Sequence, residues 1–142
     1  GRHSDAMALL HAGLQSSPGD SGLSMMLARL EVRAGQQSQA IATLERGLAD
    51  AGEEGGYLVF LATLLQGEGR HGEALRHYLR ALREDPSEPR WLVGAAVSLQ
   101  AENLPNDAAA AYQRALDTGE LGPELARFAE QRLRQIRPVS GQ

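Results

Sequence analysis

The sequence predicts an all-α protein, a right-handed α-solenoid in which helical hairpins stack side by side. Three observations favour this fold class. Small and large apolar residues recur every 34 positions, as in Ala40, Ala74 and Ala108. The apolar residues inside each unit follow helical spacing. Glycine or asparagine comes directly after the first predicted helix of each unit, where a helix can end in a left-handed residue. Internal repetition at such a period is typical of stacked repeat architectures.

Composition sets limits on the function. The chain has 142 residues, enough for one domain, and its net charge of −4 argues against nucleic-acid binding through general basicity. It contains no cysteine, so disulfides, thiolate chemistry and cysteine-based zinc sites are excluded. It has no apolar run of about 18 residues, so we expect no membrane contact from this part of the protein. The first residue is glycine, and we expect the chain to be a fragment of a longer protein.

The first predicted element is a helix near residues 4–16. Residues 1–19 match only the second half of a unit, and we interpret them as the second helix of an incomplete repeat. Its missing partner should leave Leu9, Leu10 and Leu14 partly uncovered. We therefore expect either an upstream continuation or self-association through this half repeat.

Three complete units follow, at residues 20–54, 55–88 and 89–122. Asp20 and Ser87 are candidate N-caps, and Gly35, Gly69 and Asn103 are candidate C-caps. Leucine, tyrosine and alanine at helical spacing predict two helices in each unit. The predicted pairs are 21–34 with 37–50, 56–68 with 71–84, and 88–102 with 105–118.

The second unit carries the most complete pattern. It has Leu58, Leu61 and Ala62 in its first helix, Gly69 at the turn, and then Ala74, Tyr78, Ala81 and Pro86. This pattern resembles the tetratricopeptide repeat (TPR), whose unit is a helical hairpin of 34 residues. The first unit departs from it, and the departures predict looser packing around residues 24–31. They are Ser24, Glu31 and Gly47.

The last helix is predicted at 123–136, within a capping segment of residues 123–137 that precedes a short tail at 138–142. Leu125, Phe128 and Ile136 fall on one side of it, and Arg127 and Glu130 on the other. This amphipathic pattern favours a cap that covers the last hairpin and turns a polar face outward.

We find no catalytic pattern, metal site or cofactor motif in the sequence. His71 and His77 are six residues apart and therefore lie on different faces of a helix, unlike the i, i+4 pair of a helical metal site. Glu53 and Glu54 read as solvated charge in a turn, because general acid–base catalysis needs enclosed, convergent groups. Trp91 is interpreted as filling the junction with the preceding hairpin; the alternative is that it forms, with Arg90, the rim of a binding groove. We predict that the protein is not an enzyme.

A partner-binding groove is the predicted functional site. In stacked hairpins the first helices line the concave surface, and the residues that point away from the second helix should line the groove. An apolar strip with flanking arginines suits an extended or helical peptide with apolar anchors. The plainer alternative is an ordinary solvent-facing surface. The candidate residues are Met25, Arg29, Val32, Val59, Thr63, Gln66, Arg90, Val93, Val97 and Gln100.

The C-terminal half carries a narrower set of signatures. They are Gly69-Arg70-His71 with Glu73-Ala74 and Tyr78; Arg90-Trp91 with Gly94, Ser98-Leu99 and Ala101; and Ala111-Tyr112, Ala115-Leu116, Gly119, Leu121, Leu125, Phe128 and Gln131-Arg132-Leu133. Together they resemble the MshN-type proteins of bacterial MSHA pilus biogenesis, a type IV pilus system. The resemblance implies a domain on the periplasmic side of the inner membrane that holds pilus-assembly partners.

Other interaction functions remain open. The alternatives are a generic TPR adaptor, a regulatory module attached to an upstream domain, and a self-oligomerisation module.

Overall fold

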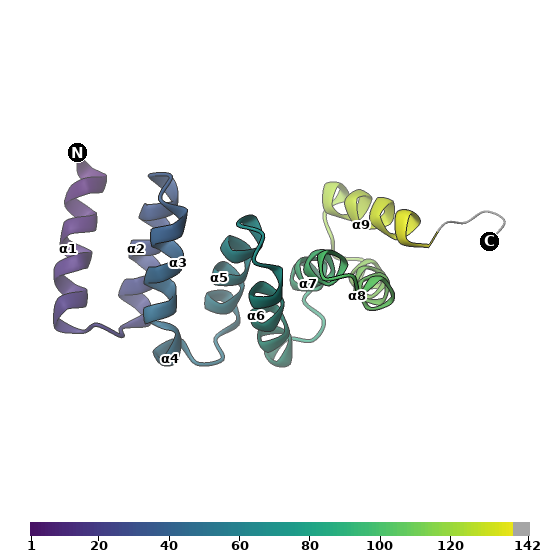
Figure 1. Cartoon of the computed structure of the whole chain (residues 1–142), viewed down its shortest axis with the longest axis horizontal. Helices are drawn as coiled ribbons and strands as arrows, with labels where there is room; N and C mark the ends of the chain where they lie inside the picture. Colours follow the sequence, from purple (N-terminus) through teal and green to yellow (C-terminus); the bar gives the residue numbers. More distant parts are fainter. Residues whose placement is uncertain (138–142) are drawn as a thin grey trace.

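The computed structural model describes residues 1–137, and the predicted tail at 138–142 lies outside them. The described part holds nine α-helices and no strand, arranged in a row along the molecule (Figure 1). The helices are α1 (Arg2–Ser16), α2 (Ser21–Arg33), α3 (Gln37–Arg46), α4 (Leu48–Ala51), α5 (Gly55–Gly67), α6 (His71–Glu84), α7 (Pro89–Ala101), α8 (Pro105–Asp117) and α9 (Pro123–Ile136).

The helices pack as hairpins. Helix α2 packs on α3, α5 on α6, and α7 on α8, and each hairpin contacts the next. Helix α1 packs on α2 at the N-terminal end, and α9 packs on α8 at the C-terminal end. The α-solenoid that the sequence predicts is therefore confirmed.

Acidic residues start the first helix of each hairpin. The carboxylates of Asp20, Glu54 and Glu88 accept hydrogen bonds from backbone amides of the first turn at 2.8, 3.1 and 2.7 Å. These bonds satisfy amides that have no partner within the helix. The expected cap at Ser87 is wrong, because its neighbour Glu88 makes these bonds.

The first helices end as the sequence predicts. Gly35 and Gly69 have φ values of +78° and Asn103 has +61°, so each adopts the left-handed conformation of a C-cap. The next residue's amide then bonds back to a carbonyl five positions earlier, as in Gln36 to Glu31 at 2.8 Å. The spacing of these residues therefore sets where the chain reverses into the second helix.

The single helix expected over 37–50 is interrupted at Gly47. The Tyr57 hydroxyl donates to the Leu44 carbonyl, and the Gly47 amide bonds to the same carbonyl at 3.2 Å. A Cβ at Gly47 would lie only 2.6 Å from the Tyr57 hydroxyl and 2.7 Å from Ser24 Oγ. Tyr57 thus inserts where glycine leaves room, and the chain continues as the short α4.

Packing in the first repeat is tighter than expected. Ser24, Glu31 and Thr43 are all buried, and the Thr43 hydroxyl donates to Glu31 Oε1 at 2.8 Å. The predicted looseness around residues 24–31 is wrong, because Tyr57 fills the space beside Ser24 and a hydrogen bond replaces the usual apolar contact at Glu31.

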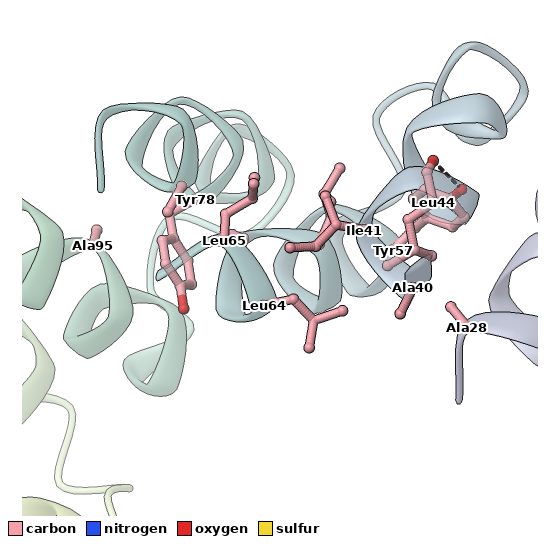
Figure 2. Packing of buried hydrophobic residues seen from close by; sticks show 12 residues of the cluster. Ala28, Ala40, Ile41, Leu44, Tyr57, Leu64, Leu65, Tyr78 and Ala95 are labelled. Carbon is pink, nitrogen blue, oxygen red and sulfur yellow. Dashed lines mark hydrogen bonds between the residues drawn. The ribbon is translucent and has the colours of Figure 1, made fainter. Parts of the chain in front are cut away.

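Buried side chains form two core clusters. The first runs through α2, α3, α5 and α6 and reaches Ala95 of α7; Figure 2 shows Ile41, Leu65 and Tyr78 within it. The second joins α7, α8 and α9 around Tyr112, whose ring meets Phe128 edge-on at 6.2 Å. The first cluster draws on three hairpins, and the second on one hairpin and α9, so the units are stabilised by stacking on their neighbours.

The two ends differ. Helix α9 buries Ala129 and exposes Glu130 and Arg134, which fits the predicted cap. Helix α1 has no buried residue, and the Leu9 side chain is 75% exposed. The expectation that Leu9 is left uncovered is confirmed.

Candidate partner-binding surface

The ten candidate groove residues all lie on the first helices α2, α5 and α7. We call the sides of these helices that carry them the inner face. The structure places the ten residues in different environments: some are exposed, some are part of the core, and some are bound to other side chains. Each group has a different capacity to contact a partner.

The valines contribute less open surface than the sequence suggests. Val93 is only 5% exposed and belongs to the second core cluster, so its expected exposure is wrong. Val59 and Val97 are partly buried against the first and second clusters, and Val32 packs similarly against the first. These side chains are held by the core clusters, which include residues of neighbouring helices that the sequence pattern of one helix does not show.

The two glutamines are engaged within the protein. Gln66 Nε2 donates to the Gly94 carbonyl and to Ser98 Oγ, both at 2.9 Å. Gln100 Oε1 accepts from Arg132 at 2.6 Å and from the Tyr112 hydroxyl at 3.3 Å. Gln66 therefore links two neighbouring repeats and Gln100 links the third repeat to α9, and only their remaining amide atoms could serve a partner's main chain.

The two arginines differ in their surroundings. Arg90 bonds to the carboxylate of Glu88 at 3.0 Å, the same residue that caps α7. Arg29 is exposed on α2 and lines a hollow with residues of α1. A partner carboxylate would compete with Glu88 at Arg90, whereas Arg29 projects toward the N-terminal end.

Met25 lies in a separate hollow where α2, α4 and the start of α5 meet. Its walls include Asp50 and Tyr57. The Ser21 amide bonds to Asp50 Oδ2 at 2.9 Å, and the hydrogen bonds from Ser21 lower the pKa of this carboxyl. Burial raises the pKa of Tyr57 to about 12, so its hydroxyl stays protonated and donates. Met25 and Arg29 thus face different depressions.

One repeat-related row reaches solvent along the inner face and continues onto α9. Arg29, Thr63 and Gln131 are exposed and Val97 is partly exposed, each 34 positions from the next along α2, α5, α7 and α9. Thr63 keeps one contact inside the protein, 3.0 Å from the Tyr78 hydroxyl. This row of one cation, two polar groups and one apolar group can contact a peptide but has no reactive arrangement.

His71 and Trp91, which the sequence also singles out, have structural contacts. His71 Nδ1 lies 3.3 Å from Ser98 Oγ, and the Trp91 ring packs on Gly55, where a Cβ would lie 2.4 Å from it. Trp91 therefore fills the junction with the preceding hairpin, as the sequence indicates. Among residues 1–137, no group of three or more His, Asp or Glu side chains could hold a metal ion.

The sequence missed part of the accessible apolar surface. Met26 is 55% exposed on α2, beside Leu10 and Leu30, and these residues line the hollow that also contains Arg29. The recurrence of a large apolar residue could have indicated this surface, because Met26 and Phe60 are 34 positions apart and occupy the same place in successive repeats.

Sequence comparison identifies the family. Residues 1–58 and residues 59–126 each match a family described as "Tetratricopeptide repeat". Together these matches take in most of the chain, and the protein belongs to the TPR family. No curated protein is similar enough in sequence to count as a relative. No enzymatic family is indicated by these matches.

Solved structures agree on the fold. A TPR protein from Parabacteroides merdae is similar with a TM-score of 0.82 and 20% identity, over 95% of this chain and 54% of that chain. YrrB, described as a TPR protein with an unusual peptide-binding site, has a TM-score of 0.78 and 20% identity, and the match covers 92% of this chain and 66% of YrrB. The Yersinia enterocolitica type III secretion chaperone SycD, in complex with a peptide of the translocator YopD, has a TM-score of 0.72 and 20% identity. The match covers 80% of this chain and 88% of the SycD chain.

The helices were also compared with the requirements for crossing a membrane. None of the helices in the described part of the chain combines the length and the apolar character that crossing a membrane requires.

Proposed function

We propose that this protein is a non-catalytic interaction scaffold that binds a peptide or a partner helix along its inner face. The observation that carries the proposal is the solvent-facing row Arg29, Thr63, Val97 and Gln131, which repeats at the 34-residue spacing of the fold. A ligand lying across successive first helices meets one side chain of this row from each. Partly buried valines beside the row would provide apolar contacts at low conformational cost, because the core already holds them.

Two fold relatives support this use of the architecture. SycD is described in complex with a peptide of its translocator, and YrrB as having a peptide-binding site. Since their identity to this chain is about one fifth, they support the type of ligand and leave the contact residues to be established.

A finer proposal concerns the cellular process. We propose that the partners belong to a type IV pilus assembly system of the MSHA type. The support for this is the set of signatures in the C-terminal half, which includes Gly69-Arg70-His71 and Gln131-Arg132-Leu133. A scaffold of stacked repeats is suited to holding several assembly components together.

The experiment is proximity labelling of the full-length protein in its own cell, comparing wild type with Thr63→Trp. The bulky indole should block the middle of the inner face, and we expect labelling of the true partner to fall at least roughly tenfold. The matched control is Arg76→Trp, an exposed position on the second helix α6, and it should leave labelling unchanged.

The outcomes separate the two levels of the proposal. Equal labelling by both variants would remove the inner face as the binding site. Partners unrelated to pilus assembly would remove the finer proposal and leave the scaffold function standing.

A further inference from the structure

A second surface lies where the second helix α6 meets the turn that leads into α8. Leu79 on α6 is 48% exposed, and Leu104, the residue directly before α8, is 43% exposed. Large apolar side chains that are exposed in the same region mark interaction sites more often than isolated ones do. This surface is formed by second helices and lies apart from the inner face.

The preceding junction between repeats carries opposite charges at the same two positions. Subtracting 34 from Leu79 and Leu104 gives Glu45 on α3 and Arg70 directly before α6. These two side chains form an ion pair at 3.8 Å and are 43% and 40% exposed. The position therefore faces solvent between two stacked hairpins, and the stacking of repeats leaves it open.

A contact that recurs at both junctions shows that they are alike on this side. Arg80 on α6 donates to the Gly52 carbonyl at 3.1 Å. Arg114 on α8, 34 positions later, donates to the Pro86 carbonyl at 2.8 Å. The two exposed leucines therefore lie across the junction from each other, in the places of the two ends of the ion pair.

Replacing the arginine by leucine leaves two carboxylates without their cation. The hydrogen bond that Arg70 donates to Glu73 at 2.7 Å raises the pKa of the guanidinium, and the charge of Glu68 adds to this shift. One repeat later, Glu102 and Asp107 occupy the places of Glu68 and Glu73. Both are exposed, and within residues 1–137 neither takes part in an ion pair. This half of the surface is therefore apolar and acidic.

The α6 half of the surface is apolar and basic. Arg76 and Arg83 are exposed and stand three positions before and four positions after Leu79, which puts all three on one face of the helix. Arg83 approaches Glu53 only to 4.0 Å, and its side chain is 75% exposed. We call the two leucines and the four charged residues beside them the junction patch. They are Arg76, Leu79, Arg83, Glu102, Leu104 and Asp107.

We propose that the junction patch binds the junction patch of a second copy of this chain, in a dimer with two-fold symmetry. In a two-fold contact the basic half of each copy meets the acidic half of the other, and Leu79 of each copy meets Leu104 of the other. The arginines of one copy then supply the cation that Arg70 supplies within the chain at the preceding junction. Contact also removes the leucines from water. The proposal does not depend on peptide binding along the inner face.

The first experiment measures self-association of the 142-residue protein by sedimentation from about 1 μM to about 1 mM. We expect a reversible monomer–dimer equilibrium, in keeping with a small patch. Leu79→Glu combined with Leu104→Arg recreates the ion pair of the preceding junction and should weaken the dimer at least roughly tenfold. A thermal melt checks that this variant is folded. Leu9→Glu, at an exposed leucine on α1, is the matched control and should leave the dimer unchanged.

The second experiment swaps charges to test the two-fold arrangement. One variant carries Arg76→Glu with Arg83→Glu, and the other carries Glu102→Lys with Asp107→Lys. Each variant alone should be monomeric at concentrations where wild type is dimeric, because like charges would face each other across the axis. An equimolar mixture should associate again, since every contact then pairs opposite charges. Recovery on mixing would not follow if these residues only stabilised their own chain.

Four results would overturn the proposal. The wild-type protein could remain monomeric at every concentration. The dimer could survive Leu79→Glu with Leu104→Arg in the folded variant, or it could be abolished by Leu9→Glu, which would place the contact on α1. The mixture of the two folded charge variants could also fail to associate.

Discussion

At the scale of single residues, the first repeat replaces one apolar contact of the core with a buried hydrogen bond between two side chains. Glu31 stands where the next repeat has Leu65, and Thr43 on α3 provides its hydrogen bond at 2.8 Å. Tyr57 reaches from α5 into the gap beside Gly47 and bonds to the Leu44 carbonyl. A buried polar group costs little when its partner is also buried, so these substitutions leave the stacking intact.

His77 should make stability depend on pH. It is partly buried, with Nδ1 lacking a hydrogen-bond partner. Burial lowers its pKa, with further lowering by Arg80 and Arg76 that Glu73 opposes. The unfolded chain therefore binds a proton more readily than the folded one between the lowered pKa and the ordinary value of 6.5, and stability falls as the pH drops through this range.

The measurement is the melting temperature between about pH 7.5 and about pH 5 for wild type and His77→Gln. We expect wild type to lose more of its melting temperature on acidification than the variant does. Identical pH dependence in the two proteins would show that His77 does not contribute.

At the scale of helices, the alanines determine how closely a hairpin closes. Ala74 on α6 and Ala108 on α8 are fully buried. Helix α6 packs on α5, and α8 packs on α7. No space is left there for additional methylene groups, whereas exposed positions on the same helices face solvent.

Ala74→Leu and Ala108→Leu should each destabilise the protein by about 1–3 kcal/mol, because the larger side chain forces the crossing helices apart. Thermal and denaturant unfolding measure the effect. Ala110→Leu is the matched control, since Ala110 is exposed on the same helix as Ala108, and it should change stability by less than about 0.5 kcal/mol. A melt of Ala108→Leu equal to wild type would contradict the assigned crossing.

At the scale of the whole molecule, the stacked row is stabilised unequally along its length. In a solenoid each unit depends on its neighbours. Helix α5 has seven buried residues and packs on α3, α4, α6 and α7, whereas α1 has no buried residue and packs mainly on α2. Helix α9 packs on α8, and its Arg132 lies over the Phe128 ring at 4.9 Å.

Hydrogen exchange should reveal this gradient. We expect backbone amides of α1 to exchange faster than those of α5, because opening α1 exposes little buried surface. Mass spectrometry of the exchanging 142-residue protein gives both rates in one experiment, so α5 is the internal reference. Equal protection of α1 and α5 would mean that the chain unfolds as one cooperative unit.

Most of the fold could be predicted from the sequence because its signals are local. Helical spacing of apolar residues predicts the helices, and Gly35, Gly69 and Asn103 predict where the first helices end. Acidic N-caps were partly missed, since Glu54 and Glu88 look like ordinary turn charges until their carboxylates are seen to bond with backbone amides. The break at Gly47 was also missed, because its cause is a tyrosine on another helix.

The candidate site was less predictable for the same reason. The sequence by itself determined the family and which side of each first helix recurs from repeat to repeat. From the same pattern we expected Val93, Gln66 and Gln100 to be exposed on that side. The tertiary structure alone decided that Val93 is buried, that Gln66 bonds to the next repeat and that Gln100 bonds to α9. The exposure and the hydrogen bonds of a side chain depend on residues about one repeat away in the sequence. The apolar pattern of one helix does not specify which residues of the neighbouring helices will contact it.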